Sequence, residues 1–585
     1  MIRLTGWVLI AGLAVAGNAQ VLSNQYLTGK YYFRQIAVGT DSKGGVVTPE
    51  SLSGTLTFSG TGTFDFGTYT VDPAGFVVMD SPLQKGKKLN ARIGPEALIG
   101  SSTESTDTTY DLFVAIPAPT KAPTFAGTYW TATLAFPAKS AIFGLTPSGS
   151  KFADFPVTGH AASIASGAMQ TQQVTGATYV VNADGTGTFS FGAGSSILGS
   201  NWNVFVSNSG NFILGGSGND ILIGVKSVTG ATNATWNGDY WGAGLRVDAT
   251  DPAPVSEFSG SVAARGLGFV TWSRRYRGFG AGAFDFSGVN RYTLASNGSG
   301  TAELAHIGLG AAGFVGTSLD ATAPDAYELY VGAVMAPVSG TGVFLNPRGA
   351  VNTASYAPAG TPIAPGEFIT LFGAGLARST QQISALPFPL TLNGVTVTIN
   401  GKSAALYYVA ADRIYAIVPY ATVGPTATIV VANQNGTSNT VTLPVAATVP
   451  GIFALDQSGA GSGAILHSDF SVVNDANPAH KGETIQIYMT GLGAVNPAVA
   501  DGRPGGTNPL STTVLPGGTS CDNSSMCVLI GGKPASISYV GLAPGLPGVY
   551  QINAQVPTAL ATGGKVPLAI VTPNAVHDQV YVPVE

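Results

Sequence analysis

The chain has 585 residues and a formal charge of −5; 45% of its residues are hydrophobic and only 10% are charged. This length exceeds one ordinary domain, so we expect several folded units. The charged fraction lies far below the usual value of roughly 25%. Nucleic-acid binders and polybasic membrane-surface proteins depend on dense positive charge, so both classes are excluded.

The N-terminus has the organisation of a signal peptide. Arg3 precedes an apolar run from Trp7 to Ala16, and Gly17 and Ala19 supply small residues at the third-last and last positions before a cut. The run is shorter than the roughly 20 apolar residues of a membrane anchor. We therefore predict that residues 1–19 are removed, that no transmembrane segment remains, and that the mature chain is secreted or held at the cell surface.

The chain has two cysteines, Cys521 and Cys527, separated by five residues. An exported chain meets oxidising conditions, which favour joining them as a disulfide that staples a small loop. A redox or metal-binding pair would show a two-residue spacing or a neighbouring histidine, and this pair has neither.

Repeats divide the first half of what we expect to be an all-β chain. Short runs rich in Val, Ile, Thr, Tyr and Phe are bounded by Gly, Asn, Asp and Pro, and helical periodicity is nearly absent. One motif, made of an apolar residue followed by a glycine and then by two adjacent aromatic residues, recurs three times. Its copies are Leu27–Tyr32, Phe125–Trp130 and Trp236–Trp241. The three predicted repeats, each a β-meander or barrel-like unit, span residues 21–122, 123–232 and 233–340.

Each repeat also carries a glycine-rich turn followed by a strand. Asp184-Gly185 and Asn297-Gly298 supply the positive φ angles of tight hairpins, and Gly60 to Phe64 carries a similar pattern in the first repeat.

The second half changes character near residue 343 and repeats internally. Gly366 to Leu376 returns as Gly482 to Leu492, and the closing strand at Ile414–Pro419 returns at Tyr550–Pro557. About seven short strands per copy predict two immunoglobulin-like β-sandwiches. These are expected over residues 350–450 and 451–585.

Several motifs of the second half occur in the order found in a known family. They are Val351–Tyr356, Phe372–Leu376, Pro450–Phe453, Gly541–Gly545 and Tyr550–Asn553. Together they make this half similar to an uncharacterised C-terminal domain family of exported acidobacterial proteins, and its openings resemble IPT/TIG modules. The resemblance implies surface or secreted architecture, and it brings no catalytic residues.

One stretch resembles a single nonapeptide of the calcium-binding parallel β-roll. Gly215 to Ile223 has the required glycines, with Asp220 as the candidate calcium ligand. Such sites take ligands from stacked neighbouring copies, and only one copy is present. The alternative is a plain hairpin turn.

The densest basic and aromatic cluster suggests a ligand surface for polysaccharide. It consists of Trp272, Arg274, Arg275, Tyr276 and Arg277. Flat aromatic rings and guanidinium groups can stack on sugars or hold an acidic polysaccharide. The alternative is a solvated edge strand, whose positive charge blocks edge-to-edge pairing.

Four tryptophans outside this cluster are expected in the core rather than on a ligand platform. They are Trp130, Trp202, Trp236 and Trp241.

No catalytic motif is recognisable. The chain has no Gly-x-Ser-x-Gly elbow, and the five histidines are scattered. Three acids, Asp239, Asp285 and Glu303, lie in the aromatic-rich third repeat, but nothing in the sequence pairs them as a glycosidase requires.

We therefore expect a non-enzymatic secreted or cell-surface protein with a structural, adhesive or polysaccharide-binding role. We expect no cofactor; calcium at Asp220 is the alternative to the plain hairpin turn. Because interfaces between consecutive modules are small, the five units are expected to form an elongated stack. The alternative is a secreted carbohydrate-active hydrolase with accessory C-terminal domains. Two facing acids in an aromatic-lined cleft would favour that alternative.

Overall fold

The computed structural model describes residues 21–47, 49–136, 139–161, 169–192, 196–248, 255–280, 282–303, 305–318, 326–521, 524–560, 564–573 and 575–585. Within these ranges the chain is all-β, as predicted, with two short 3-10 turns, η1 (Asn24–Tyr26) and η2 (Asn233–Thr235), and no α-helix. The predicted signal peptide, residues 1–19, lies outside them. No helix among the described residues is long and apolar enough to cross a membrane.

The first unit is a closed barrel in which β1 pairs with both β2 and β8. Its interior is a core of its own, with Phe33, Phe58 and Phe113 among the buried side chains. The strands of the first barrel are β1 (Thr28–Gly39), β2 (Glu50–Ser59), β3 (Thr63–Phe64), β4 (Gly67–Val71), β5 (Phe76–Asp80), β6 (Lys88–Ile93), β7 (Leu98–Ser101) and β8 (Thr109–Pro117).

The second unit is an 11-stranded sheet. Its opening strand, β9, pairs with β10 and β19, just as the opening strand of the first unit, β1, pairs with two strands. Phe143, Phe189 and Trp202 lie in its core. The strands of this sheet are β9 (Tyr129–Ala135), β10 (Lys139–Leu145), β11 (Pro147–Ser148), β12 (Lys151–Phe152), β13 (Phe155–Ala161), β14 (Gln170–Val174), β15 (Thr178–Val181), β16 (Thr186–Ser190), β17 (Asn201–Val206), β18 (Phe212–Gly216) and β19 (Asp220–Lys226).

In the third unit β20 pairs with β21 and with β27, so that eight strands close on themselves. We call this unit the third barrel. Its strands are β20 (Asn237–Asp248), β21 (Val255–Arg265), β22 (Phe269–Gly278), β23 (Phe284–Leu294), β24 (Ser299–Ala302), β25 (Ala305–Leu309), β26 (Gly313–Ser318) and β27 (Ala326–Val334).

The predicted hairpin turns are confirmed in two of these units. Gly185 and Gly298 have φ angles of 84° and 81°. The first lies between the paired strands β15 and β16, and the second between β23 and β24.

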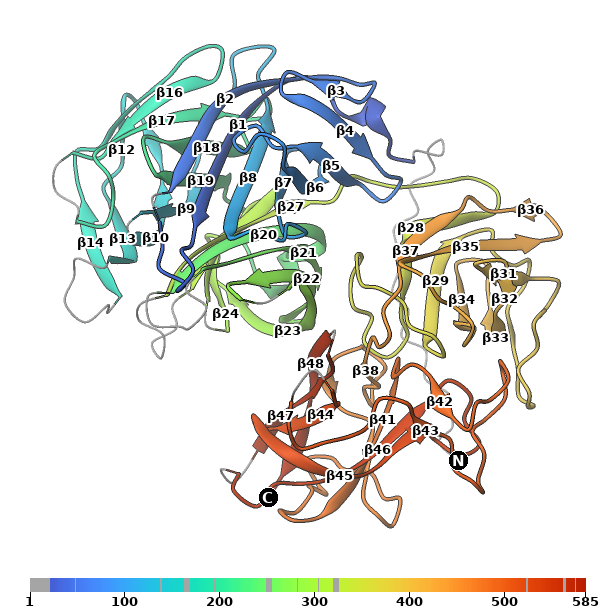
Figure 1. Ribbon diagram of the computed structural model, residues 1–585. Helices are drawn as coiled ribbons and strands as arrows, with labels where there is room; N and C mark the ends of the chain where they lie inside the picture. Colours follow the sequence, from blue (N-terminus) through green and yellow to red (C-terminus); the bar gives the residue numbers. More distant parts are fainter. Residues whose placement is uncertain are drawn as a thin grey trace.

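The three units share a second hydrophobic core, so they do not form a linear stack. Tyr32 of β1, Leu134 of β9 and Trp241 of β20 belong to one buried cluster. Figure 1 shows the blue, cyan and green units gathered around one another. The expected elongated arrangement is therefore wrong for the first half, because the outer faces of the opening strands are apolar and cover one another.

The fourth unit is a β-sandwich whose two sheets enclose Ile369, Val397 and Ile414. One sheet has the order β28-β29-β34-β33-β30 and the other β32-β31-β35-β36, with β37 beside β35. The strands are β28 (Phe344–Asn352), β29 (Phe368–Ala374), β30 (Gln381–Gln382), β31 (Thr396–Ile399), β32 (Lys402–Ser403), β33 (Ala405–Val409), β34 (Arg413–Ile417), β35 (Thr426–Asn433), β36 (Gly436–Thr437) and β37 (Val441–Pro444).

The fifth unit is a second sandwich, and its last strand also joins the third barrel. β48 runs parallel to β23, with Ser287 aligned to His577, and Figure 1 shows red β48 reaching toward green β23. The strands are β38 (Gly451–Ile452), β39 (Gly461–Ser462), β40 (Ile465–Leu466), β41 (Thr484–Thr490), β42 (Val495–Asn496), β43 (Thr512–Thr513), β44 (Cys527–Ile530), β45 (Lys533–Leu542), β46 (Tyr550–Gln555), β47 (Gly564–Val571) and β48 (Ala575–Val584).

Candidate functional site

A cavity of about 210 Å³ lies inside the third barrel, and all eight strands contribute to its wall. Pockets for drug-sized ligands span roughly 300–1,000 Å³. An eight-stranded barrel leaves an interior wide enough for one small ligand. The cavity is thus large enough for a small molecule or for one residue of a polymer.

Side chains alternate between the two faces of β20, and glycines on its inner face explain why this strand leaves the cavity open. Trp241, Ala243 and Leu245 point out of the barrel into the shared core. Gly242 and Gly244 alternate with them and therefore face inward. A Cβ atom at Gly242 would meet nothing closer than 3.9 Å, whereas one at Gly244 would lie 2.4 Å from the Phe258 ring. Gly242 therefore borders open space, and Gly244 admits an aromatic ring.

The basic and aromatic cluster predicted as a ligand surface lies on β22. This strand pairs with β21 on one side and β23 on the other, so it is not a sheet edge. Successive side chains of a strand point to opposite faces. Trp272 and Arg274 line the cavity, while Arg275 and Arg277 face away from it. Of the five residues predicted as a ligand surface, Trp272 and Arg274 are thus the two that line the cavity.

Arg274 is held between two aromatic rings. Its Cζ atom lies 4.4 Å from the centre of the Phe258 ring and 4.5 Å from that of Trp272. The indole of Trp272 is itself fixed, because its Nε1 donates to Asn290 Oδ1 at 2.7 Å. Among the described residues, Arg274 has no hydrogen-bond acceptor and no ion-pair partner for its guanidinium. Its five N–H donors are thus available to a ligand.

Carboxyl groups face Arg274 within the same cavity. Glu328 of β27 is half-buried in the wall, and Glu303 is exposed after β24 with a φ of 50°. Burial raises the pKa of both carboxyl groups, and Arg274 opposes that shift in each case. Burial also raises the pKa of Tyr330, whose ring lines the cavity. The cavity therefore offers acceptors as well as donors.

The outward face of β22 binds the third barrel to the first. Arg277 Nε donates to Glu257 Oε1 at 2.9 Å, and both side chains are almost completely buried. Arg277 Nη1 donates to the carbonyl oxygens of Ser105 and Asp107 in the first barrel. Arg275 contacts Glu104 at 2.8 Å. Both arginines thus contact the first barrel, and neither lines the cavity.

The three acids noted in the third repeat do not come together. Asp239 pairs with Arg265 at 2.6 Å on the surface, and Asp285 pairs with Arg275 at 3.3 Å. Of the three, Glu303 alone lines the cavity.

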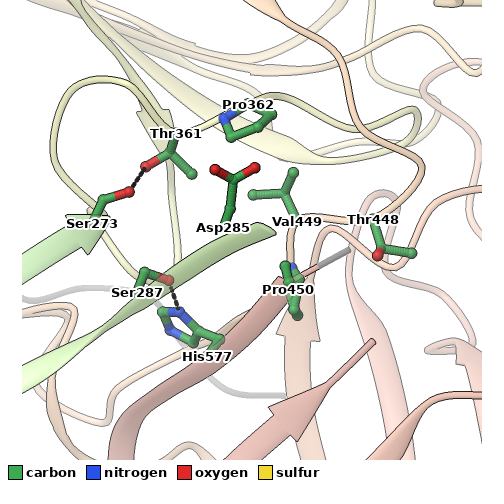
Figure 2. Close-up of a pocket in the computed structure, with 10 residues that line it drawn as sticks. Ser273, Asp285, Ser287, Thr361, Pro362, Thr448, Val449, Pro450 and His577 are labelled. Atoms are coloured by element: carbon green, nitrogen blue, oxygen red, sulfur yellow. Dashed lines mark hydrogen bonds between the residues drawn. The ribbon is translucent and has the colours of Figure 1, made fainter. Parts of the chain in front are cut away.

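A second, far smaller cavity of about 10 Å³ lies where the third barrel meets both sandwiches (Figure 2). Ser287 Oγ and His577 Nδ1 are 2.6 Å apart, and Thr361 Oγ1 donates to Ser273 Oγ at 3.0 Å. This volume suits about one water molecule. The serine–histidine pair has no room for a substrate, and the nearby Asp285 is taken up by Arg275, so the contact is structural.

Asp220 lies at the contact between the first and second units. Arg34 donates through Nη2 to Asp220 Oδ1 at 3.3 Å, and Ser217 N donates to the same oxygen at 2.8 Å. β18 and β19 pair as the alternative hairpin requires. The described residues hold no group of three or more ligating side chains. Calcium at Asp220 stays a prediction, and the ion would have to displace Arg34.

The cysteines and tryptophans are placed as follows. Cys521 and Cys527 are joined by a disulfide with a Cα–Cα distance of 5.2 Å. Trp202, Trp236 and Trp241 are buried. Trp130 is half-buried against the shared core.

Sequence reasoning missed Glu328 and Phe258 as parts of the cavity. Glu328 lies in an alternating run, between Tyr327 and Leu329, whose other face is also buried. When both faces of a strand are enclosed, its sequence has no clearly polar face. The hydrophobic pattern of β27 therefore did not indicate that one face borders a cavity.

No family model and no curated protein matches the chain. A solved structure of the surface glycan-binding protein SGBP-B from the mixed-linkage glucan utilization locus of Bacteroides ovatus, in complex with a mixed-linkage heptasaccharide, is 11% identical. The alignment covers 61% of this chain and 64% of that one, less than two thirds of its length, with a TM-score of 0.17.

Two further structures show comparable likeness. The γ-CGTase of alkalophilic Bacillus clarkii is 12% identical over 56% of this chain and 37% of that one, with a TM-score of 0.13. The extracellular region of plexin A4 is 6% identical over 88% and 80%, also with a TM-score of 0.13. At these TM-scores none of the three carries an argument about function.

Proposed function

We propose that this chain is a non-enzymatic, exported polysaccharide-binding protein whose third barrel holds one sugar residue. The single observation that carries the proposal is Arg274, fixed between Phe258 and Trp272 with its donors unused, in a cavity of about 210 Å³. Small binding sites combine apolar walls with a few placed polar groups in this way.

The polar groups of the cavity suit a hydroxyl-rich ligand. A sugar hydroxyl both donates and accepts hydrogen bonds, and the wall supplies donors from Arg274 and acceptors from Glu328. Aromatic side chains supply the apolar contact that sugar rings need.

The C-terminal sandwich pair serves, in this proposal, as the stalk or attachment unit. The signal-peptide pattern at residues 1–19 and the resemblance of the second half to domains of exported proteins support a secreted or surface location. The parallel pairing of β23 with β48 gives the barrel a fixed position against this unit.

The test is binding of the chain from residue 21 to an array of polysaccharides, with released reducing sugar assayed in the same wells. We expect binding without release. Arg274→Gln should weaken binding about tenfold or more, because charge-assisted hydrogen bonds are lost. Arg265→Gln, which removes a surface arginine of the same barrel, should bind normally. Failure of every polysaccharide to bind would refute the proposal.

A second candidate, a carbohydrate-active hydrolase, is favoured by one observation. Glu303 and Glu328 line the same aromatic-walled cavity, and burial raises the pKa of both, as expected of a general acid. Release of reducing sugar that Glu328→Gln abolishes would establish this function in place of simple binding.

A further inference from the structure

The three arginines of β22 differ in how much of their charge is already neutralised. Arg277 faces the buried carboxylate of Glu257, and Arg275 faces Glu104 and Asp285. Both therefore have anionic partners within the protein. Arg274 alone has a guanidinium without such a partner among the described groups.

Acids surround Arg274 at longer range. Glu328, Asp578 and Glu303 all act on it electrostatically. Glu328 and Glu303 belong to the cavity wall, and Asp578 comes from β48, where it is aligned with Gly288 of β23. A carboxylate entering this cavity would meet the carboxyl groups of Glu328 and Glu303 and two guanidiniums, those of Arg274 and Arg246. The guanidinium of Arg246 is already paired with Asp248 at 2.8 Å.

We infer that the cavity selects an uncharged sugar residue, free or at the end of a glycan, over a uronic acid. This inference rests on the proposed function and names its ligand class. Hydroxyl groups can donate to Glu328 and Glu303 and accept from Arg274, so every one of these groups gains a partner. A uronate satisfies Arg274 but adds a like charge beside the carboxylates in a site of low dielectric, where such repulsion is strong.

The size of the cavity limits the ligand to one residue. Its volume of about 210 Å³ lies below the range for drug-sized ligands. The barrel wall is continuous through the β20–β27 pairing, so a chain cannot lie across it as in an open groove. A glycan therefore enters by its end.

The experiment measures dissociation constants at pH 7 for matched sugars: glucose with glucuronate and glucosamine, and galactose with galacturonate and galactosamine. We expect a neutral sugar to bind at least about tenfold tighter than its uronate, which is roughly the effect of one unfavourable charge contact. Glu328→Gln should reduce the ratio of the uronate's dissociation constant to that of the neutral sugar, because the variant lacks one of the carboxylates that repel the uronate. Arg265→Gln is the control.

Each other outcome is decisive. A uronate that binds as tightly as the neutral sugar overturns the inference and leaves polysaccharide binding intact. A bound polysaccharide that none of these sugars displaces likewise overturns it, since the chain end is then not what the protein holds. Absence of binding to every sugar and polysaccharide refutes both the inference and the proposed function.

Discussion

Ser287 Oγ lies 2.6 Å from His577 Nδ1, across the parallel pair that β23 of the third barrel forms with β48 of the second sandwich. The two residues are 290 positions apart in sequence. Their contact fixes the barrel against the C-terminal unit. Because the histidine is buried, it also makes that junction sensitive to acid.

We predict that the contribution of His577 to stability is lost in acid. Burial lowers the pKa of His577 to about 3 from its usual 6.5, so the folded protein keeps it neutral. The unfolded chain takes up a proton as the pH falls below 6.5, which favours unfolding by about 2 kcal/mol at pH 5. The measurement is the free energy of unfolding in urea at pH 5, 6, 7 and 8.

His577→Gln is the comparison that isolates this effect. Burial raises the pKa of Asp578 to about 7, which stabilises the fold as the pH falls through that value, and the pKa of Asp285 is raised as well. Both acids remain in the variant. The stability gap between the wild type and His577→Gln should therefore shrink toward pH 5. Parallel curves would show that His577 is not responsible.

A second prediction concerns the buried pair of Arg277 and Glu257. Glu257→Gln removes the closer, buried charge partner of the guanidinium and leaves it only Asp107, at 3.8 Å. We expect a loss of about 3–5 kcal/mol in the free energy of unfolding. Arg275→Gln breaks a contact that is partly in solvent and should cost no more than about 1 kcal/mol. Equal losses in the two variants would contradict the interface role of Arg277. Thermal and urea unfolding of both variants provide the test.

The sequence predicted the three opening strands because their paired aromatics have two separate roles. Tyr240 packs inside the third barrel and Trp241 in the shared core. Tyr129 likewise packs inside the second unit. Adjacent side chains of a strand point to opposite faces, so the two aromatics of each pair pack in different cores. The motif therefore repeats on each opening strand that lies between two cores.

The candidate site was only half predicted, for a physical reason. The cluster on β22 stood out by composition, but composition does not show which face of a strand looks into a lumen. Here Arg274 faces the cavity and Arg277 a protein interface. Glu328 and the pairing of Ser287 with His577 depend on contacts between distant strands, which no local pattern encodes.

The disulfide gives a third prediction. Cys521 and Cys527 close a short loop, and cross-linking so few residues restricts the unfolded chain only modestly. Replacing both with serine should lower the free energy of unfolding by about 2 kcal/mol. Reduction of the wild type should give the same change, and it should leave sugar binding in the third barrel unaffected. A loss of binding on reduction would contradict the separation of the two regions.

The fourth prediction separates the two interpretations of Asp220. Because Arg34 already pairs with it, Asp220→Ala should destabilise the contact between the first and second units equally in calcium and in a chelator. The measurement is the thermal transition of wild type and variant under both conditions. A calcium-dependent rise in the wild type that the variant lacks would instead establish a cation site.

The last prediction tests the cavity without removing any polar group. Gly242→Val places a side chain where a Cβ atom has no neighbour closer than 3.9 Å, so it should fill the cavity with a change in stability of less than about 1 kcal/mol. Sugar binding should fall about tenfold or more, because the ligand and the valine compete for one volume. The matched variant Gly244→Val drives its Cβ into the Phe258 ring, 2.4 Å away, and should lower the melting temperature instead. A folded Gly242→Val protein that binds sugar as the wild type does would place the binding site outside the third barrel. Isothermal titration and thermal unfolding of the two variants thus distinguish an occupied cavity from a damaged fold.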